Sequence, residues 1–349
     1  MVVISFEEEI KMISALLMKL NVPEEMAKVT AEVLAEGDAR GFSSHGLLRL
    51  PYILRALKRG TIIPNPEIKI VRETAAAAMV DGGHGLGHPV AARGMKIAIE
   101  KAKRSGVGCV GIKNTNHFGI AGYYAEMATR EGLVGIVTTT TDALVHPWGG
   151  VEPVLGTNAL AVGIPWKPHP ILLDMAMSVA ARGKIVSAAK EGVEIPLGWA
   201  VDSEGKPTTD PRKAIAGALS PFGGVKGYGL TFVLEILAGP LVGGAAGREV
   251  VGTLEPVEGF STKGDLLLAI DPRAFVEREE FLKNVERFVA EVKGSKRAVG
   301  VEEILVPGEP EFRTREKRLR EGIPIADEVW EELGQMAKEM GVDLEEIRR

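Results

Sequence analysis

The chain has 349 residues, enough for two domains or one large one, and 45% of them are hydrophobic and 26% charged, as in globular proteins. The formal net charge of −5 argues against non-specific binding to nucleic acids or anionic membranes. Cys109 is the single cysteine, which excludes an intramolecular disulfide and a zinc site made of cysteines.

The chain begins with the acidic stretch MVVISFEEEI, and its most apolar window, 229–244, is short and contains Glu235 and Pro240. We therefore expect no signal peptide, no membrane span and a cytoplasmic location. Gln335 is the only glutamine, beside many Glu, Lys and Arg residues, which indicates a thermophilic source.

The first 60 residues predict helices. Ser5 and Glu8 have capping-box spacing at the start of FEEEIKMISALLMKL, and Pro23 opens PEEMAKVTAEVLAEG. A third helix is expected over SSHGLLRLPYILRALKRG (43–60), where Pro51 either kinks the helix or begins a new one.

This third segment carries His45, Arg49 and Tyr52 at i, i+4 and i+7, which places them on one face of a continuous helix. Taken alone, such a stripe is more typical of a solvated face or of a buried histidine with a partner. If Pro51 splits the helix, Tyr52 leaves this face while His45 and Arg49 stay on it.

From about residue 67, apolar strand patterns alternate with helical ones, which predicts an α/β fold with a mixed sheet (mixed α+β). The expected strands are 68–73, 75–83, 107–113, 133–141, 160–166, 171–178 and 265–272, and the expected helices are 88–106, 120–132, 178–192 and 225–239. The tail predicts helices at 277–295, 311–322 and 327–340. We expect residues 1–72 and 275–349 to form one discontinuous helical domain around an α/β domain of residues 73–274.

A glycine-rich turn, VDGGHGLGHPVAARG, connects a predicted strand and helix as in dinucleotide-binding sheets. Gly83 and Gly85 fit the G-x-G-x-x-G pattern, but His88 takes the third position, so we favour a plain glycine turn. His84 and His88 are four residues apart, but Pro89 favours a helix start near His88, and we expect no metal site.

Polar residues follow two predicted strands, at KNTNHFGIAGYY and TTTTDALVHPWGG. The carboxyl ends of strands in open α/β sheets are where ligands usually bind. The other explanation is a buried network that stabilises the turns. Lys226 stands among glycines at a predicted helix start, which suits a phosphate or carboxylate, or else a solvated loop.

Together, seven segments resemble the malate/L-lactate dehydrogenase family that is distinct from the Rossmann dehydrogenases and also includes ureidoglycolate, sulfolactate and diketogulonate oxidoreductases. In chain order the segments are SSHGLLRLPYI, KNTNHFGIAGYY, HPWGG, GTNALAVGIP, LLDMAMSVAARGKI, FGGVKGYGLTFVLEIL and VPGEPEF. They cover nearly the whole chain.

The resemblance implies a non-Rossmann middle domain that binds NAD or NADP, and a homodimer. It implies His117 and His45 as catalytic candidates and Arg49 as the residue that binds the substrate carboxylate. The residues implied along the cofactor are Thr141, Asp174, Met175, Ala176, Lys226, Gly308, Glu309 and Pro310.

These residues suit the oxidation of a 2-hydroxy acid, in which a base removes the hydroxyl proton while hydride leaves C2 for the nicotinamide. Histidine, with an ordinary pKa of about 6.5, can take and return a proton near neutral pH, and arginine can bind a carboxylate with two hydrogen bonds. We favour His117 for proton transfer and His45 for orienting the substrate oxygen, with a hydrogen bond from Tyr52.

Malate is the expected substrate, with Arg182 or Lys184 as candidates for its second carboxylate. L-lactate, L-sulfolactate and ureidoglycolate are alternatives, and no residue selects clearly between NAD and NADP. A different class, a non-catalytic protein that binds nucleotides or small anions, would explain Lys226 and the glycines but would leave the two histidines without a task.

Overall fold

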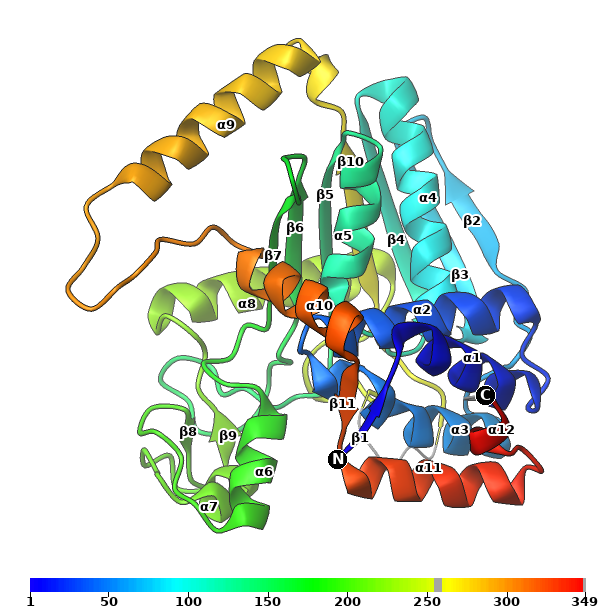
Figure 1. The fold of residues 1–349 in the computed structure, drawn as a ribbon. Coiled ribbons are helices and arrows are strands. Elements are labelled where there is room, and N and C mark those ends of the chain that lie inside the picture. Colours follow the sequence, from blue (N-terminus) through cyan, green and yellow to red (C-terminus); the bar gives the residue numbers. More distant parts are fainter. Residues whose placement is uncertain (254–258, 348–349) are drawn as a thin grey trace.

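A seven-stranded mixed sheet forms the centre of the computed structural model, which describes residues 1–253 and 259–347 (Figure 1). In spatial order its strands are β2 (Lys69–Glu73), β3 (Ala77–Gly85), β4 (Val107–Thr115), β10 (Asp265–Ile270), β5 (Val134–Thr139), β6 (Leu160–Ile164) and β7 (Ile171–Met175). Among these strands only β3 and β4 pair in parallel. The prediction of a mixed sheet is confirmed, and the order differs from that of a Rossmann sheet.

Two helices pack on this sheet, α4 (Gly87–Ser105) against β4 and β10, and α5 (Ala121–Arg130) against β5 and β6. β4 and β5 each carry a glycine, Gly108 and Gly135, beneath the helix that covers the strand. A Cβ atom on Gly108 would lie 1.9 Å from the carbonyl oxygen of Ala98, and one on Gly135 would lie 2.4 Å from that of Ala125. The glycines therefore allow both helices to approach the sheet closely.

Helices from the two chain ends share a second core. They are α1 (Phe6–Met18), α2 (Glu24–Ala39), α3 (Leu50–Arg59), α11 (Asp327–Glu339) and α12 (Leu344–Ile347), and β1 (Val2–Ile4) pairs antiparallel with β11 (Ile323–Ile325) beside them. Leu16, Leu34 and Leu54 from the start of the chain and Leu333 from its end are fully buried in this core. The capping box is confirmed, because Glu8 N donates to Ser5 Oγ at 3.1 Å and Ser5 N donates to Glu8 Oε2 at 2.6 Å.

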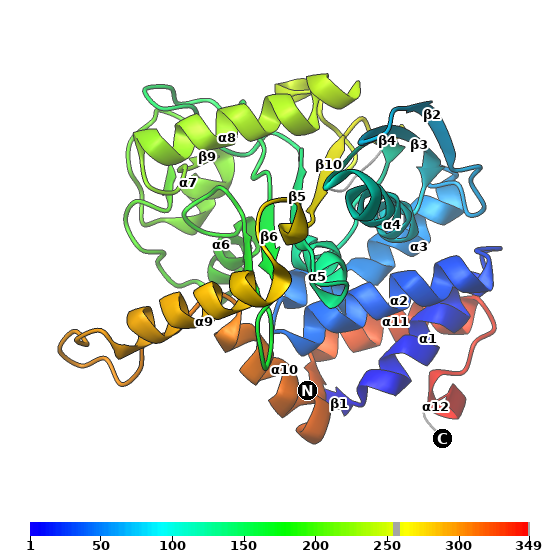
Figure 2. The ribbon, with the colours of Figure 1, turned by 90° about the horizontal axis from the view of Figure 1, so that it is seen from above.

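A smaller unit packs around Val145, Leu155, Ile185 and Leu219. It contains α6 (Arg182–Glu191), α7 (Pro211–Ala216), β8 (Ala200–Val201) and β9 (Ala218–Leu219), of which only α6 was predicted from the sequence. The remaining helices are α8 (Val225–Ala238), α9 (Arg278–Gly294) and α10 (Glu309–Glu321). Figure 2 shows α9 at the periphery, with the chain continuing outward before it returns to α10.

The stretch Val225–Val242 passes a length and hydropathy test for a membrane span, with a mean hydropathy of 1.4. Its α-helix is only 14 residues long, about 21 Å, whereas a span needs about 30 Å. Inside it, Glu235 is buried and accepts hydrogen bonds from Gly156 N at 3.1 Å and Gly247 N at 2.8 Å. These contacts make α8 a packed helix of this fold.

Of the two alternatives for residues 43–60, the second is confirmed: a new helix begins next to Pro51, and no single kinked helix forms. Two 3₁₀ turns, Ser43–His45 and Leu47–Arg49, precede α3, and Pro51 occupies the first turn of that α-helix. A proline is tolerated there because the first N–H groups of a helix have no partner inside it. Pro51 therefore marks the start of a helix and not a kink.

Candidate active site

Two histidines from distant parts of the chain lie side by side. His45 ends the first 3₁₀ turn, and His117 follows β4, as predicted for a residue at a strand end. Their ring centroids are 5.3 Å apart, and the rings are tilted by 32°. The structure thus brings together the two residues that the resemblance implied as catalytic.

The C-terminus of α2 fixes the turn that carries His45. The carboxylate of Asp38 accepts a hydrogen bond from Leu47 N at 2.5 Å. A Cβ atom on Gly46 would lie 2.0 Å from that carboxylate, and one on Gly37 would lie 2.9 Å from His45 O, so both positions require glycine. Burial raises the pKa of Asp38 to about 6, next to the buried carboxyl of Glu9, whose pKa burial and the Asp38 charge also raise.

Arg49 and Tyr52 both reach the segment 252–253. Arg49 Nη1 donates to Thr253 O at 3.3 Å, its Nε donates to Ser44 O at 3.0 Å, and the Tyr52 hydroxyl donates to Gly252 O at 2.7 Å. Asp142 holds the same segment by accepting from Thr253 N at 2.8 Å. Tyr52 therefore stays next to Arg49 although the helix is split, because both side chains share this partner.

Both catalytic candidates are held in the neutral form. Burial, and then the charge of Arg49, lower the pKa of His45 to about 4. The pKa of His117 lies well below its ordinary value because of burial and of Arg49, His45, His88 and Lys263 around it. Ser44 Oγ lies 2.9 Å from His45 Nδ1, and Gly119 N donates to His117 Nδ1 at 3.2 Å.

His88, the residue in place of the third fingerprint glycine, is buried at 1% exposure. Neither of its ring nitrogens has a hydrogen-bond partner among the described residues, and burial with nearby Lys263 lowers its pKa to about 3. The glycine that packs closely is Gly87, where a Cβ atom would lie 2.0 Å from Asn116 O. No sequence pattern indicated a third buried histidine beside the first two.

His84 and His88 do not share a helix face, because α4 begins at Gly87 while His84 lies in β3 with a φ of 56°. The His84 ring stacks on Phe260 at 4.1 Å between ring centroids. Within residues 1–253 and 259–347, no group of three or more His, Cys, Asp or Glu side chains is placed to hold a metal ion.

A pocket of about 370 Å³ lies between β7 and the start of α10, at some of the positions implied for the cofactor. Asp174, Gly308 and Pro310 line it together with Arg40, Phe42, Leu172, Leu173, Leu305, Val306, Pro307 and Glu311. Gly308 has a φ of 95°, and its Cβ atom would lie 3.0 Å from that of Leu172, so that glycine keeps this wall open. Asp174 accepts a hydrogen bond from Gly122 N at 2.7 Å, and burial raises its pKa to about 6.

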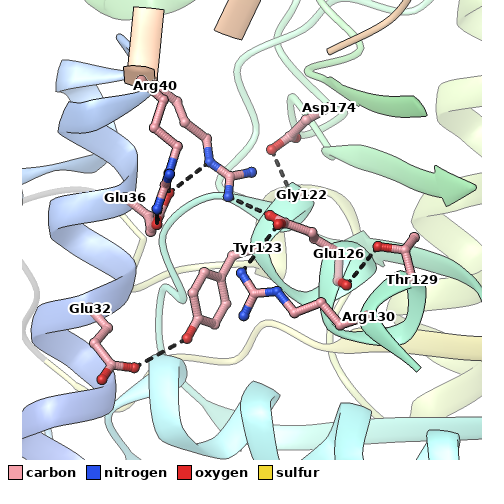
Figure 3. Close-up of polar contacts among 10 residues, drawn as sticks. Glu32, Glu36, Arg40, Gly122, Tyr123, Glu126, Thr129, Arg130 and Asp174 are labelled. Carbon is pink, nitrogen blue, oxygen red and sulfur yellow. Dashed lines mark hydrogen bonds and ion pairs between the residues drawn. The ribbon is translucent and has the colours of Figure 1, made fainter. Parts of the chain in front are cut away.

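A buried charge network borders this pocket (Figure 3). The guanidinium of Arg40, 3% exposed, donates to Glu36 at 3.0 Å and also pairs with Glu126 of α5. Arg315 of α10 makes a forked pair with the same Glu36, at 2.6 and 2.8 Å. No sequence pattern indicated a buried role for Arg40, because a charged residue at a helix end is normally solvated.

The other cofactor candidates lie outside this pocket. Thr141 accepts from Thr157 N at 2.9 Å, Lys226 is exposed in the first turn of α8, and Glu309 accepts from Val306 N at 2.8 Å. Met175 and Ala176 follow Asp174 directly in the chain. The structure therefore groups only Asp174, Gly308 and Pro310 in one pocket.

The pocket has the size and lining of a small-molecule site. Small-molecule sites are mostly apolar concave surfaces of roughly 300–1,000 Å³ with a few placed polar groups, and here apolar side chains surround the carboxyl of Asp174. These residues fit one part of a dinucleotide, and the exposed Lys226 among glycines at the start of α8 suits a phosphate.

A family model described as malate/L-lactate dehydrogenase matches residues 4–334. The chain belongs to this family. A malate/(S)-sulfolactate dehydrogenase of Methanothermus fervidus is 47% identical over 342 residues, covering 98% of this chain and 99% of that protein. The solved sulfolactate dehydrogenase of Methanocaldococcus jannaschii superposes with a TM-score of 0.95 at 45% identity, covering 99% of both chains.

Two other relatives are named with different cofactors. A (2R)-3-sulfolactate dehydrogenase (NADP(+)) of Chromohalobacter salexigens is 38% identical and covers 81% of this chain and 84% of that protein. A ureidoglycolate dehydrogenase (NAD(+)) of Escherichia coli is 34% identical and covers 95% of this chain and 94% of that protein. The family dehydrogenases thus use NAD or NADP.

The buried histidines predict a loss of stability in acid. In the unfolded chain each ring takes up a proton as the pH falls through about 6.5, whereas the folded protein resists protonation down to a pH of about 4 at His45 and about 3 at His88. The unfolded state therefore binds more protons in this range, and the free energy of unfolding decreases as the pH falls from 6.5 towards 4.

We expect His88→Leu to reduce this acid-dependent loss by about 2 kcal/mol between pH 7.5 and pH 4.5, measured by denaturant unfolding. The matched control is Val90→Ala, a buried apolar residue of the same helix, which should lower the free energy of unfolding without changing its pH dependence. Equal pH dependence in wild type and His88→Leu would contradict the expectation.

Proposed function

We propose that this protein is an NAD(P)-dependent oxidoreductase that interconverts a 2-hydroxy acid and a 2-oxo acid, with malate and oxaloacetate as its substrates. The observation that carries the proposal is the pair of half-buried neutral histidines, 5.3 Å apart, beside the fixed cation of Arg49. A neutral imidazole can accept a proton and the guanidinium can bind a carboxylate, which are the two tasks that a 2-hydroxy acid sets.

Sulfolactate is the second candidate substrate. It is favoured by the names of the relatives at 47% and 45% identity, and it carries a sulfonate where malate has its second carboxylate. Both are 2-hydroxy acids with a second anionic group, so Arg49 would bind either in the same way. Arg182 and Lys184, in the first turn of α6, are proposed for the second anionic group.

Each side chain has a separate part in the mechanism. Arg49 would bind the carboxylate and orient C2, while Tyr52 and Asp142 hold the segment 252–253 that Arg49 contacts. The two histidine rings are half-buried, which leaves them accessible to a bound substrate. Asp174, Met175, Ala176, Gly308, Glu309, Pro310, Thr141 and Lys226 would hold NAD(P), which when bound accepts or returns the hydride.

We propose that His117 takes the hydroxyl proton and that His45 orients the oxygen. The alternative is an exchange of roles, and it is favoured by the hydrogen bond from Gly119 N to His117 Nδ1. In that alternative, Nδ1 of the neutral His117 ring would keep its lone pair, and Nε2 would carry the proton and donate a hydrogen bond to the substrate oxygen. The hydroxyl of Ser44 can donate to or accept from His45 Nδ1, which leaves Nε2 of His45 free to act as a base.

A substrate panel tests the proposed activity. L-malate, sulfolactate, L-lactate and ureidoglycolate are supplied with NAD or NADP, and the formation of NAD(P)H is followed by absorbance. We expect turnover with a substrate that has two anionic groups, and kcat/KM for L-lactate lower by roughly a hundredfold because one charged contact is missing. Cofactor binding without turnover on any of these acids would instead support the non-catalytic reading.

Single variants test the roles of the two histidines. The pH–rate profile of kcat is compared between His117→Ala and His45→Ala, with cofactor binding measured by fluorescence as a control for folding. We expect His117→Ala to lower kcat by roughly a thousandfold and to abolish the acidic limb, and His45→Ala to retain that limb with a smaller loss. Loss of the limb in His45→Ala alone would reverse the assignment.

We also propose that the protein is a homodimer, with helix α8 in the interface. Its apolar side chains on one side are exposed by about half: Val225, Phe232, Val233 and Ile236, at 45–54%. These residues recur at helical spacing, and contiguous exposed apolar surfaces of this kind are typical of protein interfaces. A second copy of this chain would cover them.

Light scattering should give twice the chain mass of 37.3 kDa for the wild type. We expect Phe232→Glu to shift the particle towards the monomer, because a carboxylate would be buried in an apolar contact. Phe288→Glu is the matched control, since Phe288 is an exposed phenylalanine on α9, at 64%. A monomeric wild type would contradict the proposal.

A further inference from the structure

Lys263 is a buried lysine beside the histidine centre that has no part in the mechanism above. It is 1% exposed and lies two residues before Asp265, the first residue of β10. Its Nζ pairs with Oδ1 of Asp265, itself fully buried, at 2.5 Å. Burying an ion pair is costly and is often no more stabilising than apolar packing. A role other than stabilising the fold therefore explains this pair better.

The ammonium group of Lys263 reaches the residues on both sides of His117. Nζ donates to Asn116 O at 3.3 Å and lies 4.5 Å from the centre of the Phe118 ring. Cation–π contacts of this kind are strongest when both groups are desolvated, as they are here. Lys263 thus contacts the backbone of Asn116, which precedes His117, and the ring of Phe118, which follows it.

Other hydrogen bonds hold Asn116 and Phe118, the two residues that Lys263 contacts. The side-chain amide of Asn116 donates to Gly85 O at 2.8 Å and to His84 O at 3.1 Å, and the Tyr124 hydroxyl donates to Phe118 O at 2.5 Å. The turn 116–118 is therefore tied to β3 and α5, and Lys263 closes the remaining side from the segment before β10. The ring of His117, between these two fixed residues, lies next to that of His45.

We propose that Lys263, held by Asp265, is a positioning residue that locks the turn 116–118 and so fixes the His117 ring against His45. The inference rests on the proposed function for what the positioned ring does, but the locking itself needs no turnover. Its charge has a second effect: the groups that face His117 are Arg49, His45, His88 and Lys263, and none of them is anionic. Lys263 therefore adds to the forces that keep the His117 ring unprotonated.

The test variant is Lys263→Met with Asp265→Asn, which removes both charges so that neither is left buried alone. The matched control is Lys101→Met with Glu73→Gln. Lys101 is also buried, at 8% exposure, pairs with Glu73 at 2.9 Å and donates to a backbone carbonyl, Thr74 O, at 2.6 Å, but this carbonyl belongs to the turn between β2 and β3. Lys263→Arg is the conservative variant, because it retains a charge and donors.

Two measurements on the full-length protein separate positioning from plain stability. Histidine NMR, with the His117 signal identified by its loss in His117→Gln, should show the ring beginning to protonate about one pH unit higher in the Lys263/Asp265 variant than in the wild type. Steady-state kinetics should show kcat roughly tenfold lower with the Kd for NAD(P)H unchanged. The Lys101/Glu73 control should match the wild type in both, and Lys263→Arg should recover part of the loss.

A folded Lys263/Asp265 variant with wild-type kcat and wild-type His117 titration would overturn the proposal. If that variant does not fold, Phe118→Leu decides, because it removes the ring contact and keeps the ion pair. A drop in kcat of threefold or more at unchanged KM supports the proposal, and an unchanged kcat overturns it. If the protein oxidises no 2-hydroxy acid, the proposed function fails, and the NMR titration still decides whether Lys263 acts on His117.

Discussion

The geometry of the candidate site depends on the buried charge of Arg40. Its guanidinium pairs with Glu36 on its own helix and with Glu126 on α5, and Arg315 of α10 pairs with the same Glu36. Because a buried ion costs several kcal/mol when a partner is missing, these elements have little freedom to move apart. Arg40 lies five residues before His45, and Glu126 lies nine residues after His117, so the network joins the two segments that carry the histidines.

Close backbone contacts then set the distance between these segments. Gly37 and Gly46 let the end of α2 press against the turn of His45, and Gly87 lets α4 approach the carbonyl of Asn116, next to His117. None of these positions has room for a Cβ atom, so larger side chains would push the histidine segments apart. The glycines near the site thus have a packing role, and the predicted glycine turn is explained without a Rossmann motif.

Local signals in the sequence predicted much of the fold. The capping box, the strand patterns and the helix at 88–106 depend on neighbouring residues, and they appear close to their expected bounds. The strand order could not be predicted from local signals. β10 lies between β4 and β5 in the sheet, although more than a hundred residues separate it from both in the sequence. The short strands β8 and β9 were missed since two residues carry no periodicity.

Only part of the site was predicted, again because sequence patterns report local structure and not tertiary contacts. The stripe of His45, Arg49 and Tyr52 assumed one helix, but two 3₁₀ turns form instead, and Leu47 N in the second of them donates a hydrogen bond to Asp38. The resemblance, not the periodicity, pointed to His45 and His117 together. The burial of Arg40, His88 and Lys263 was not predicted, because burial of a polar side chain is decided by residues far away in the chain.

The charges around the site all oppose protonation of the histidines. Arg49 and Lys263 are cations near the imidazoles of His45, His88 and His117, and the pKa of each histidine is lowered, so the protein alone opposes a further positive charge at this point. An acid with two anionic groups, as we propose for the substrate, would oppose this field when it binds at Arg49 and would raise the affinity of the histidines for a proton. Proton transfer would then become favourable only when the substrate is in place, because the charge that makes an imidazolium tolerable arrives with it.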